Sequence, residues 1–167
     1  MATNVPVNAY QRRLLAEDQC PVAIRRLPPW LFPPASARNL IAANAIIIPA
    51  IGAGFTDIVR VQVDRGKNGV IKWFANQFVG NGFQDGSGSL IWRLLIDGKT
   101  VPGFESILVS LGTNQAPREI APVRLLNARL VELQVSNLAI VPAGQIIEGS
   151  IAGWLYPEKE EPPGMLY

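Results

Sequence analysis

The sequence predicts an all-β protein, a jelly-roll or Greek-key β-sandwich of about eight strands with an extended N-terminal arm. Three observations predict this class. Apolar and polar residues alternate with a period of two in several segments after residue 44, and turn-forming residues separate these segments. No stretch beyond residue 40 keeps a helical period over a dozen residues. The chain therefore divides into an arm (1–40), a sandwich core (41–157) and a charged C-terminal tail (158–167), which we expect to be solvated.

The arm is predicted from its prolines, since six of the chain's 14 lie in residues 1–40. Proline fixes φ and biases the preceding residue toward extended backbone. A polyproline-like strip is therefore expected, and its apolar side chains must pack against their own domain or a neighbour. We favour a groove on a neighbouring subunit. The candidate assembly contacts are Leu27, Pro28, Pro29, Trp30, Leu31, Phe32, Pro33 and Pro34.

The candidate strands follow the arm in chain order. They are residues 45–48, 59–64, 70–75, 90–96, 106–111, 120–126, 131–136 and 146–156. Residues 90–96 are almost wholly apolar, which indicates a strand buried on both faces or in a subunit contact. Most connections are too long for simple hairpins, so a jelly-roll path is favoured over a meander.

Two local signals sharpen this interpretation. Asp97-Gly98 stands between two strand-like residues and predicts a type I′ hairpin turn, which needs positive φ. Gly149 and Gly153 lie within the last candidate strand and predict a bulge or bend there.

Composition argues against several classes of function. Lys and Arg number 15 and Asp and Glu 13, and a net charge of +2 does not favour a nucleic-acid partner. The most apolar stretch, residues 40–51, is shorter than the roughly 20 residues of a membrane-spanning helix, so no membrane association is expected. The chain has no histidine and one cysteine, Cys20, so we expect no cofactor and no Cys- or His-based metal site or nucleophile.

Two alternatives remain open. Trp73, Trp154 and Tyr156 form a possible aromatic surface, which would suit a carbohydrate- or receptor-binding module; packing in the core or a subunit contact is favoured. A pair of carboxylates would suit a carbohydrate-active enzyme. Its candidates are Glu105, Glu119, Glu132 and Glu148, of which Glu132 alternates with apolar neighbours as a solvent-side strand residue does. We expect no catalytic residues.

Three segments together carry a resemblance to a known family. They are residues 91–104, which include the Asp97-Gly98 turn, residues 123–137, and the closing residues 149–157. This arrangement resembles small jelly-roll accessory proteins of tailed-bacteriophage virions, which decorate heads or form collars at the neck. The resemblance implies a virion structural protein that forms a homo-oligomer and docks on a major capsid, portal or neck protein. It implies no catalytic residues.

Overall fold

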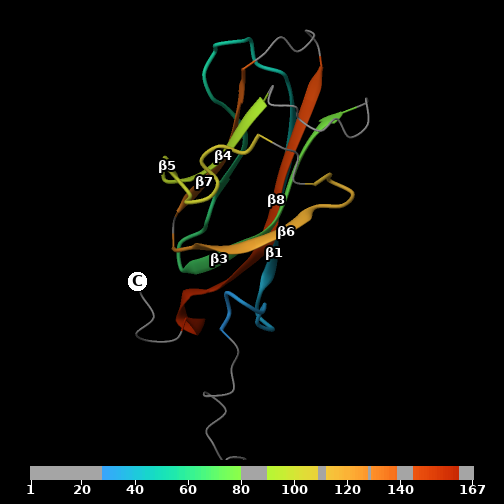
Figure 1. The fold of residues 1–167 in the computed structure, drawn as a ribbon. Coiled ribbons are helices and arrows are strands. Elements are labelled where there is room, and N and C mark those ends of the chain that lie inside the picture. Colours follow the sequence, from blue (N-terminus) through green and yellow to red (C-terminus); the bar gives the residue numbers. More distant parts are fainter. Residues whose placement is uncertain (1–27, 80–89, 109–111, 128, 139–144, 162–167) are drawn as a thin grey trace, which may run out of the picture.

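The protein folds into a sandwich of two four-stranded antiparallel sheets (Figure 1). The computed structural model describes residues 28–79, 90–108, 112–127, 129–138 and 145–161. In chain order, its elements are β1 (Arg38–Ile47), β2 (Thr56–Gln62), β3 (Lys67–Val79), β4 (Leu90–Ile96), β5 (Lys99–Thr100), β6 (Arg118–Leu125), β7 (Leu130–Asn137), β8 (Ile146–Pro157) and the short 3₁₀ helix η2 (Glu158–Glu160).

The strand order confirms the predicted jelly roll. Sheet A has the order β1-β8-β3-β6 and sheet B the order β2-β7-β4-β5. Every connection except the β4–β5 hairpin crosses from one sheet to the other, and the first and last strands lie side by side. A meander would instead keep consecutive strands adjacent, so this path is that of an eight-stranded jelly roll.

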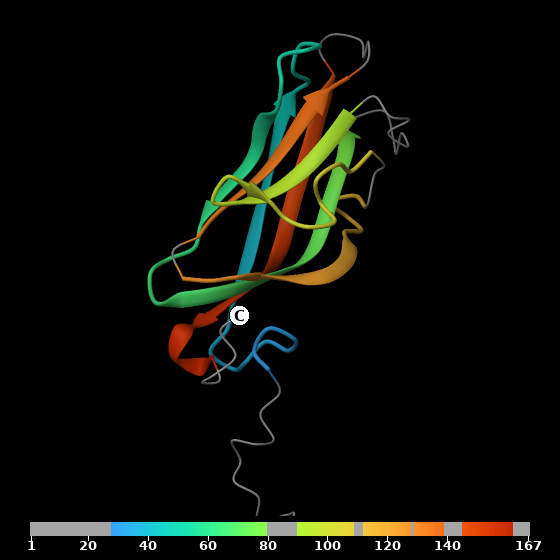
Figure 2. The same cartoon turned by 60° about the vertical axis from the view of Figure 1, so that its left-hand side comes forward.

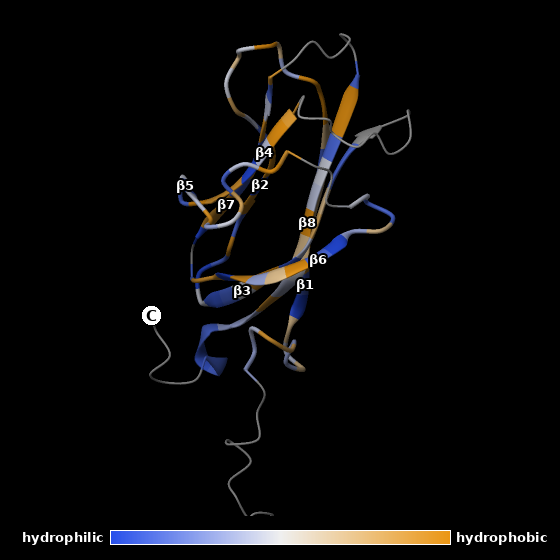
Figure 3. Ribbon diagram, in the orientation of Figure 1, coloured by the Kyte–Doolittle hydropathy of each residue, from blue (hydrophilic) through white to orange (hydrophobic). Residues whose placement is uncertain are grey.

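The core fills the space between the two sheets. In β7, the alternate residues Val131, Leu133 and Val135 are fully buried, as the period-two pattern of this strand predicted. Trp92 in the apolar strand β4 is also buried in this core. Apolar residues accordingly appear on the strands of both sheets, whereas η2 is hydrophilic (Figure 3). Burial of each large apolar side chain contributes roughly 1.5–3 kcal/mol.

The two glycines of β8, the strand between β1 and β3 in sheet A, stand where an added side chain would meet neighbouring atoms. A Cβ added at Gly149 would lie 2.9 Å from a side chain of β7, and one added at Gly153 would lie 1.8 Å from the carbonyl O of Val70. The β3–β8 register shifts opposite Gly153, between Ile71 and Trp73. Of the irregularities predicted at the two glycines, the structure therefore shows only one, opposite Gly153, and its extra residue belongs to β3. Gly149 pairs regularly with Asn76 and with Asn44.

The β4–β5 hairpin forms at the predicted turn. Asp97 has a φ of 51° and Gly98 a φ of 74°, the positive values that a type I′ turn requires. The Asp97 carboxylate pairs with the Arg129 guanidinium and accepts a hydrogen bond from the Leu130 N–H at 2.8 Å. These hydrogen bonds, that of Arg129 first, hold the pKa of Asp97 below its ordinary value. The turn is thereby fastened to the start of β7.

Two sequence predictions need correction. β1 begins at Arg38, so the sandwich starts before the predicted boundary at residue 41. Residues 106–111 do not form a strand where the structure describes them. Ile107 makes only an isolated bridge with Trp92, because one residue pair exchanges hydrogen bonds, at 2.8 and 2.9 Å, and the ladder does not continue.

Residues 28–37 and residues 158–161 close the same end of the sandwich (Figures 1 and 2). The prediction of a solvated tail is wrong for Glu161, whose side chain is 7% exposed against sheet A, whereas Glu158 and Lys159 are exposed. The Glu158 N–H donates to the Gly66 carbonyl O at 2.9 Å. Residues 162–167 lie outside the described residues. Among the residues that are described, no helix has the length and apolar character needed to cross a bilayer.

Candidate assembly surface

The proline-rich strip forms turns where an extended segment was predicted. The N–H groups of Leu31 and Phe32 both donate to the Pro28 carbonyl O, at 2.9 and 3.1 Å, and the Ala37 N–H donates to that of Pro34 at 2.9 Å. The φ that proline imposes suits a turn as well as an extended chain, so the prolines alone do not decide between them. The extended conformation is therefore wrong for residues 28–32, and Leu27 lies outside the described residues.

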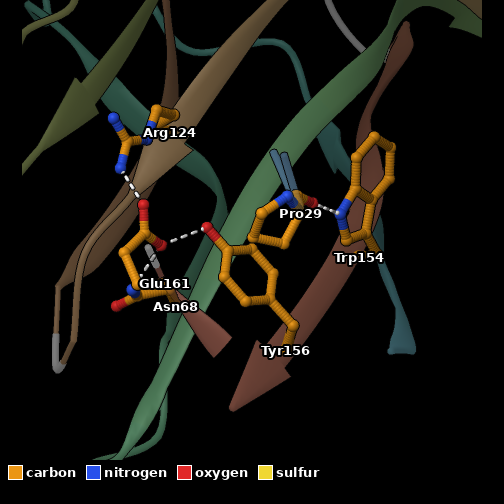
Figure 4. A network of polar contacts seen from close by, with 6 residues as sticks. All are labelled: Pro29, Asn68, Arg124, Trp154, Tyr156 and Glu161. Carbon is orange, nitrogen blue, oxygen red and sulfur yellow. Dashed lines mark hydrogen bonds and ion pairs between the residues drawn. The ribbon is translucent and has the colours of Figure 1, made fainter. Parts of the chain in front are cut away.

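Pro29 and Trp30 pack against the outer face of sheet A in their own chain. The Trp154 indole N–H donates to the Pro29 carbonyl O at 2.7 Å (Figure 4). Trp30 packs on a small apolar cluster formed by Val70, Trp154 and Tyr156. The structure thus uses Pro29 and Trp30 for the fold of their own domain, where a neighbour's groove was expected.

The predicted aromatic surface is covered. Trp154 and Tyr156 share one face of β8, as expected, but they are only 3% and 1% exposed. Trp73 is half-buried, and its ring meets that of Trp154 edge to face, with centroids 6.1 Å apart. Trp154 and Tyr156 are therefore packed, as the sequence analysis favoured, and the alternative of an exposed aromatic surface does not hold for them. Trp30 and Glu161 cover them.

Glu161 joins the C-terminal covering segment to sheet A (Figure 4). Its side chain is 7% exposed and forms an ion pair with Arg124. The same carboxylate accepts hydrogen bonds from the Tyr156 hydroxyl at 2.7 Å and the Asn68 amide at 2.9 Å. Burial, and then the hydrogen bond to Glu161, raise the pKa of Tyr156 above its ordinary value. The Arg124 guanidinium also lies over the Trp30 ring, 4.3 Å from its centroid.

The two most exposed large apolar side chains of the described residues lie on β1. Ile41 and Ile47 point outward from β1 and are 72% and 67% exposed. Ile146 lies opposite Ile47 in the β1–β8 register. The full set of exposed large apolar residues in the described chain is Leu31, Phe32, Ile41, Ile47, Ile51, Phe55, Leu108, Leu138 and Ile146.

Sequence reasoning missed Ile41 and Ile47 as candidate contacts. Residues 40–51 were considered as a possible membrane span and residues 45–48 as a candidate strand, but neither interpretation made Ile41 or Ile47 a contact. A usable signal was present, because no Asp, Glu, Lys or Arg occurs between Arg38 and Asp57. A strand with one face in water would normally carry polar residues on that face.

The outer face of sheet B differs from this apolar surface. The Arg93 guanidinium donates to the Gln134 amide O at 2.8 Å, and the Gln134 amide N donates to the Asp57 carboxylate at 2.7 Å. Arg93 also lies over the Phe55 ring, 3.6 Å from its centroid. Arg93, Gln134 and Asp57 on this face therefore have partners within the chain.

Two of the candidate glutamates lie on sheet A but far apart. Glu119 is opposite Trp73 in the β3–β6 register, and Glu148 is opposite Gln77 in the β3–β8 register. Four residues along β3 span about 13 Å. This separation exceeds the roughly 5–9.5 Å between the carboxyl groups of a glycosidase. Each also has a nearer partner, since Glu119 pairs with Lys72 at 3.0 Å and Glu148 accepts from Gln77 at 2.8 Å.

The other two glutamates lie elsewhere. Glu132 is on the outer face of sheet B, 3.5 Å from the Arg60 guanidinium, and it is buried, although a solvated strand residue was predicted. Glu105 accepts from the Gly103 N–H at 2.8 Å in the loop after β5. Within the described residues, no three His, Cys, Asp or Glu side chains gather as metal ligands would.

No protein-family model matches this chain, and no curated protein matches it in a sequence comparison. Its function is therefore inferred from the fold, the surface and the chemistry of its side chains.

Proposed function

We propose that this protein is a non-enzymatic structural subunit of a virion, which self-associates and docks on a capsid or on the neck between head and tail. One observation carries the proposal: Ile41 and Ile47 are 72% and 67% exposed on β1, and no charged residue occurs between Arg38 at the start of that strand and Asp57. Soluble monomers rarely expose contiguous apolar patches of large area. Removal of such area from water contributes roughly 25 cal/mol per Å², so a subunit interface is the favoured environment for it.

The virion setting is supported by the resemblance of residues 91–104, 123–137 and 149–157 to accessory proteins of tailed bacteriophages. In the sandwich, these segments supply β4 and β5, part of β6 and β7, and most of β8. Jelly rolls serve in capsids and also in lectins and cupins, so the fold by itself does not select one function. The apolar surface favours the assembly role among these.

The docking contact that we propose is narrower than the strip predicted from the sequence. Leu31 and Phe32 are 44% and 53% exposed, and they sit on the turn that Trp30 anchors to sheet A. They therefore present a small apolar tip at a fixed place on the domain. A capsid, portal or neck protein with a complementary apolar pocket would bury both side chains.

The rival functions have less support. A sugar-binding surface needs exposed rings, whereas Trp154 and Tyr156 are buried beneath Trp30 and Glu161. A carboxylate pair needs two close glutamates, and the candidates lie on different faces or about 13 Å apart along β3.

Self-association is tested by the molar mass of the full chain in light scattering or sedimentation equilibrium, over a range of concentrations. We expect a mass that exceeds the 18.1 kDa of one chain. A mass of one chain at every concentration, with no binding to any virion protein, would overturn the proposal.

Docking is tested by co-sedimentation with assembled capsids, portals and neck complexes. The double variant Leu31→Ser/Phe32→Ser removes the exposed tip and is expected to abolish co-sedimentation without lowering the melting temperature. Leu108→Ser is the matched control, because Leu108 is equally exposed at 44% but lies in the loop after β5. Equal co-sedimentation of all three proteins would show that the tip is not the docking contact.

A further inference from the structure

The four edge strands of the sandwich differ in how they are protected from pairing with other strands. Long, regular and apolar edges invite such pairing, and proteins prevent it with charges, prolines, bulges or short strands. β2 carries the exposed Arg60 and a register shift, β5 has only two residues, and β6 contains Pro122. β1 has ten residues, pairs with β8 without a register shift and has no proline. Within the described residues, no strand lies on its other side.

The hydrogen bonds of β1 show which residues face this open edge. The Ile48 N–H donates to the carbonyl O of Gln145 at 3.0 Å, and these two residues continue the β1–β8 register. In an antiparallel ladder, residues that bond to the neighbouring strand alternate with residues whose N–H and C=O groups point away. Even-numbered residues of β1 therefore bond to β8. Odd-numbered residues, from 39 to 47, present their backbone groups to the open edge.

The outward side chains of these odd-numbered residues form a pattern that is symmetric about Asn44. Ile41 and Ile47 stand three positions before and after it, and Ala43 and Ala45 stand one position before and after it. In an antiparallel pair of two β1 strands centred on Asn44, Ile41 faces Ile47 of the second copy and Ala43 faces Ala45. In this register the pairs that exchange hydrogen bonds consist only of odd-numbered residues, whose backbone groups point away from β8, and they would form about eight hydrogen bonds.

We propose that β1 pairs antiparallel with β1 of a second copy of this chain, about a two-fold axis at Asn44. The two A sheets then form one eight-stranded sheet with an apolar seam of isoleucine and alanine. Such a contact is isologous, since the same strand serves both subunits. The inference rests on the proposed self-association and specifies its geometry.

Charge exchange across the seam tests the register. Ile41→Lys is expected to weaken self-association on the order of 100-fold, because a cation replaces a buried apolar group. Adding Ile47→Glu to this variant restores association, because residue 41 faces residue 47 of the other copy. Within one chain the two positions are about 20 Å apart, so the rescue acts only between chains. If the register were instead centred on Ala43, residue 41 would face residue 45, and Ala45→Glu rather than Ile47→Glu would restore association. Leu138→Lys, on an exposed residue beyond β7, is the matched control and leaves the mass unchanged.

Disulfide formation gives a second test that does not depend on charge. In a Cys20→Ala background, Asn44→Cys places two thiols directly opposite each other, with Cα atoms about 4.5 Å apart. That separation suits a disulfide. Ala45→Cys is the control, because its Cα atoms would lie about 8.5 Å apart, beyond the reach of a disulfide. Mild oxidation is expected to give a covalent dimer of the first variant and none of the second.

The outcomes separate this inference from the proposed function. An oligomeric chain with no Asn44→Cys dimer, and with a mass unaffected by Ile41→Lys, overturns the β1 pairing and leaves self-association standing. That result would also follow if the open edge held another protein or residues 1–27 of the chain itself. A single-chain mass at all concentrations overturns both. Cross-linking at Asn44 alone, together with rescue by Ile47→Glu, supports the register centred on Asn44.

Discussion

Trp30→Ala tests whether Trp30 stabilises its own domain or contacts a partner. Trp30 packs on Trp154 and Tyr156, and the Arg124 guanidinium lies over its ring. Phe32 is two residues further along the same turn and is 53% exposed. Replacement of each by alanine removes an aromatic ring, so Phe32→Ala is the matched control.

The expected magnitude follows from the burial of Trp30. Replacement of a fully buried Trp or Phe by Ala typically costs 3–5 kcal/mol, and about half of that, roughly 2 kcal/mol, is expected for a half-buried ring. Loss of the cation–π contact with Arg124 adds roughly 0.5–1 kcal/mol. A loss of about 2–3 kcal/mol lowers the melting temperature of a domain of this size by about 8–12 °C. Phe32→Ala should cost less than about 0.5 kcal/mol.

Circular dichroism during heating and urea titration measures both variants without reliance on tryptophan fluorescence. All proteins are compared at one concentration, since association makes stability depend on concentration. We expect Trp30→Ala to lower the urea midpoint at an unchanged slope and Phe32→Ala to leave it in place. Equal midpoints for Trp30→Ala and the unmodified chain would refute the packing of Trp30 on sheet A and return it to the set of partner contacts.

Three further predictions concern sheet A. Glu161→Gln breaks the largely buried ion pair with Arg124 and should lower the free energy of unfolding by about 1–3 kcal/mol in urea titration. The raised pKa of Tyr156 favours the neutral phenol in the folded state, so stability is retained below pH 10.0 and falls as the pH rises above it. As the pH rises above 10.0, the urea midpoint of Tyr156→Phe should fall less than that of the unmodified chain. Gly153→Ala should prevent soluble expression, because its Cβ would overlap a backbone carbonyl of β3, whereas Gly149→Ala should fold with a loss of about 1–3 kcal/mol, because its Cβ meets the ends of side chains.

Local signals in the sequence were sufficient to predict much of the fold. Asp97-Gly98 occupies a turn that demands positive φ, and few other residue pairs accept that conformation, so the hairpin was predictable from two residues. Val131, Leu133 and Val135 face the core because the side-chain period of a strand is two. Such predictions succeed where geometry within a few residues decides the structure.

Contacts between distant parts of the chain were not predictable in this way. Trp154 and Tyr156 stand on the same face of β8, and their spacing left open whether that face is packed or exposed. Whether that face is exposed depends on Trp30, more than 120 positions away, and on Glu161, which stands in a segment whose charge suggested a solvated tail. Alternation along a strand identifies its two faces but not what covers the outer one.

The same limit explains why β1 was recognised only in part, and why it is informative. Its inward side chains, Leu40 and Ile46 among them, belong to the core, but its outward side chains Ile41 and Ile47 are apolar too. The alternation that identifies a half-buried strand is therefore lost. A strand that is apolar on both faces normally occurs where both faces are buried. In one copy of this chain only the inner face of β1 is covered, so the sequence of the strand matches an environment that a second molecule completes.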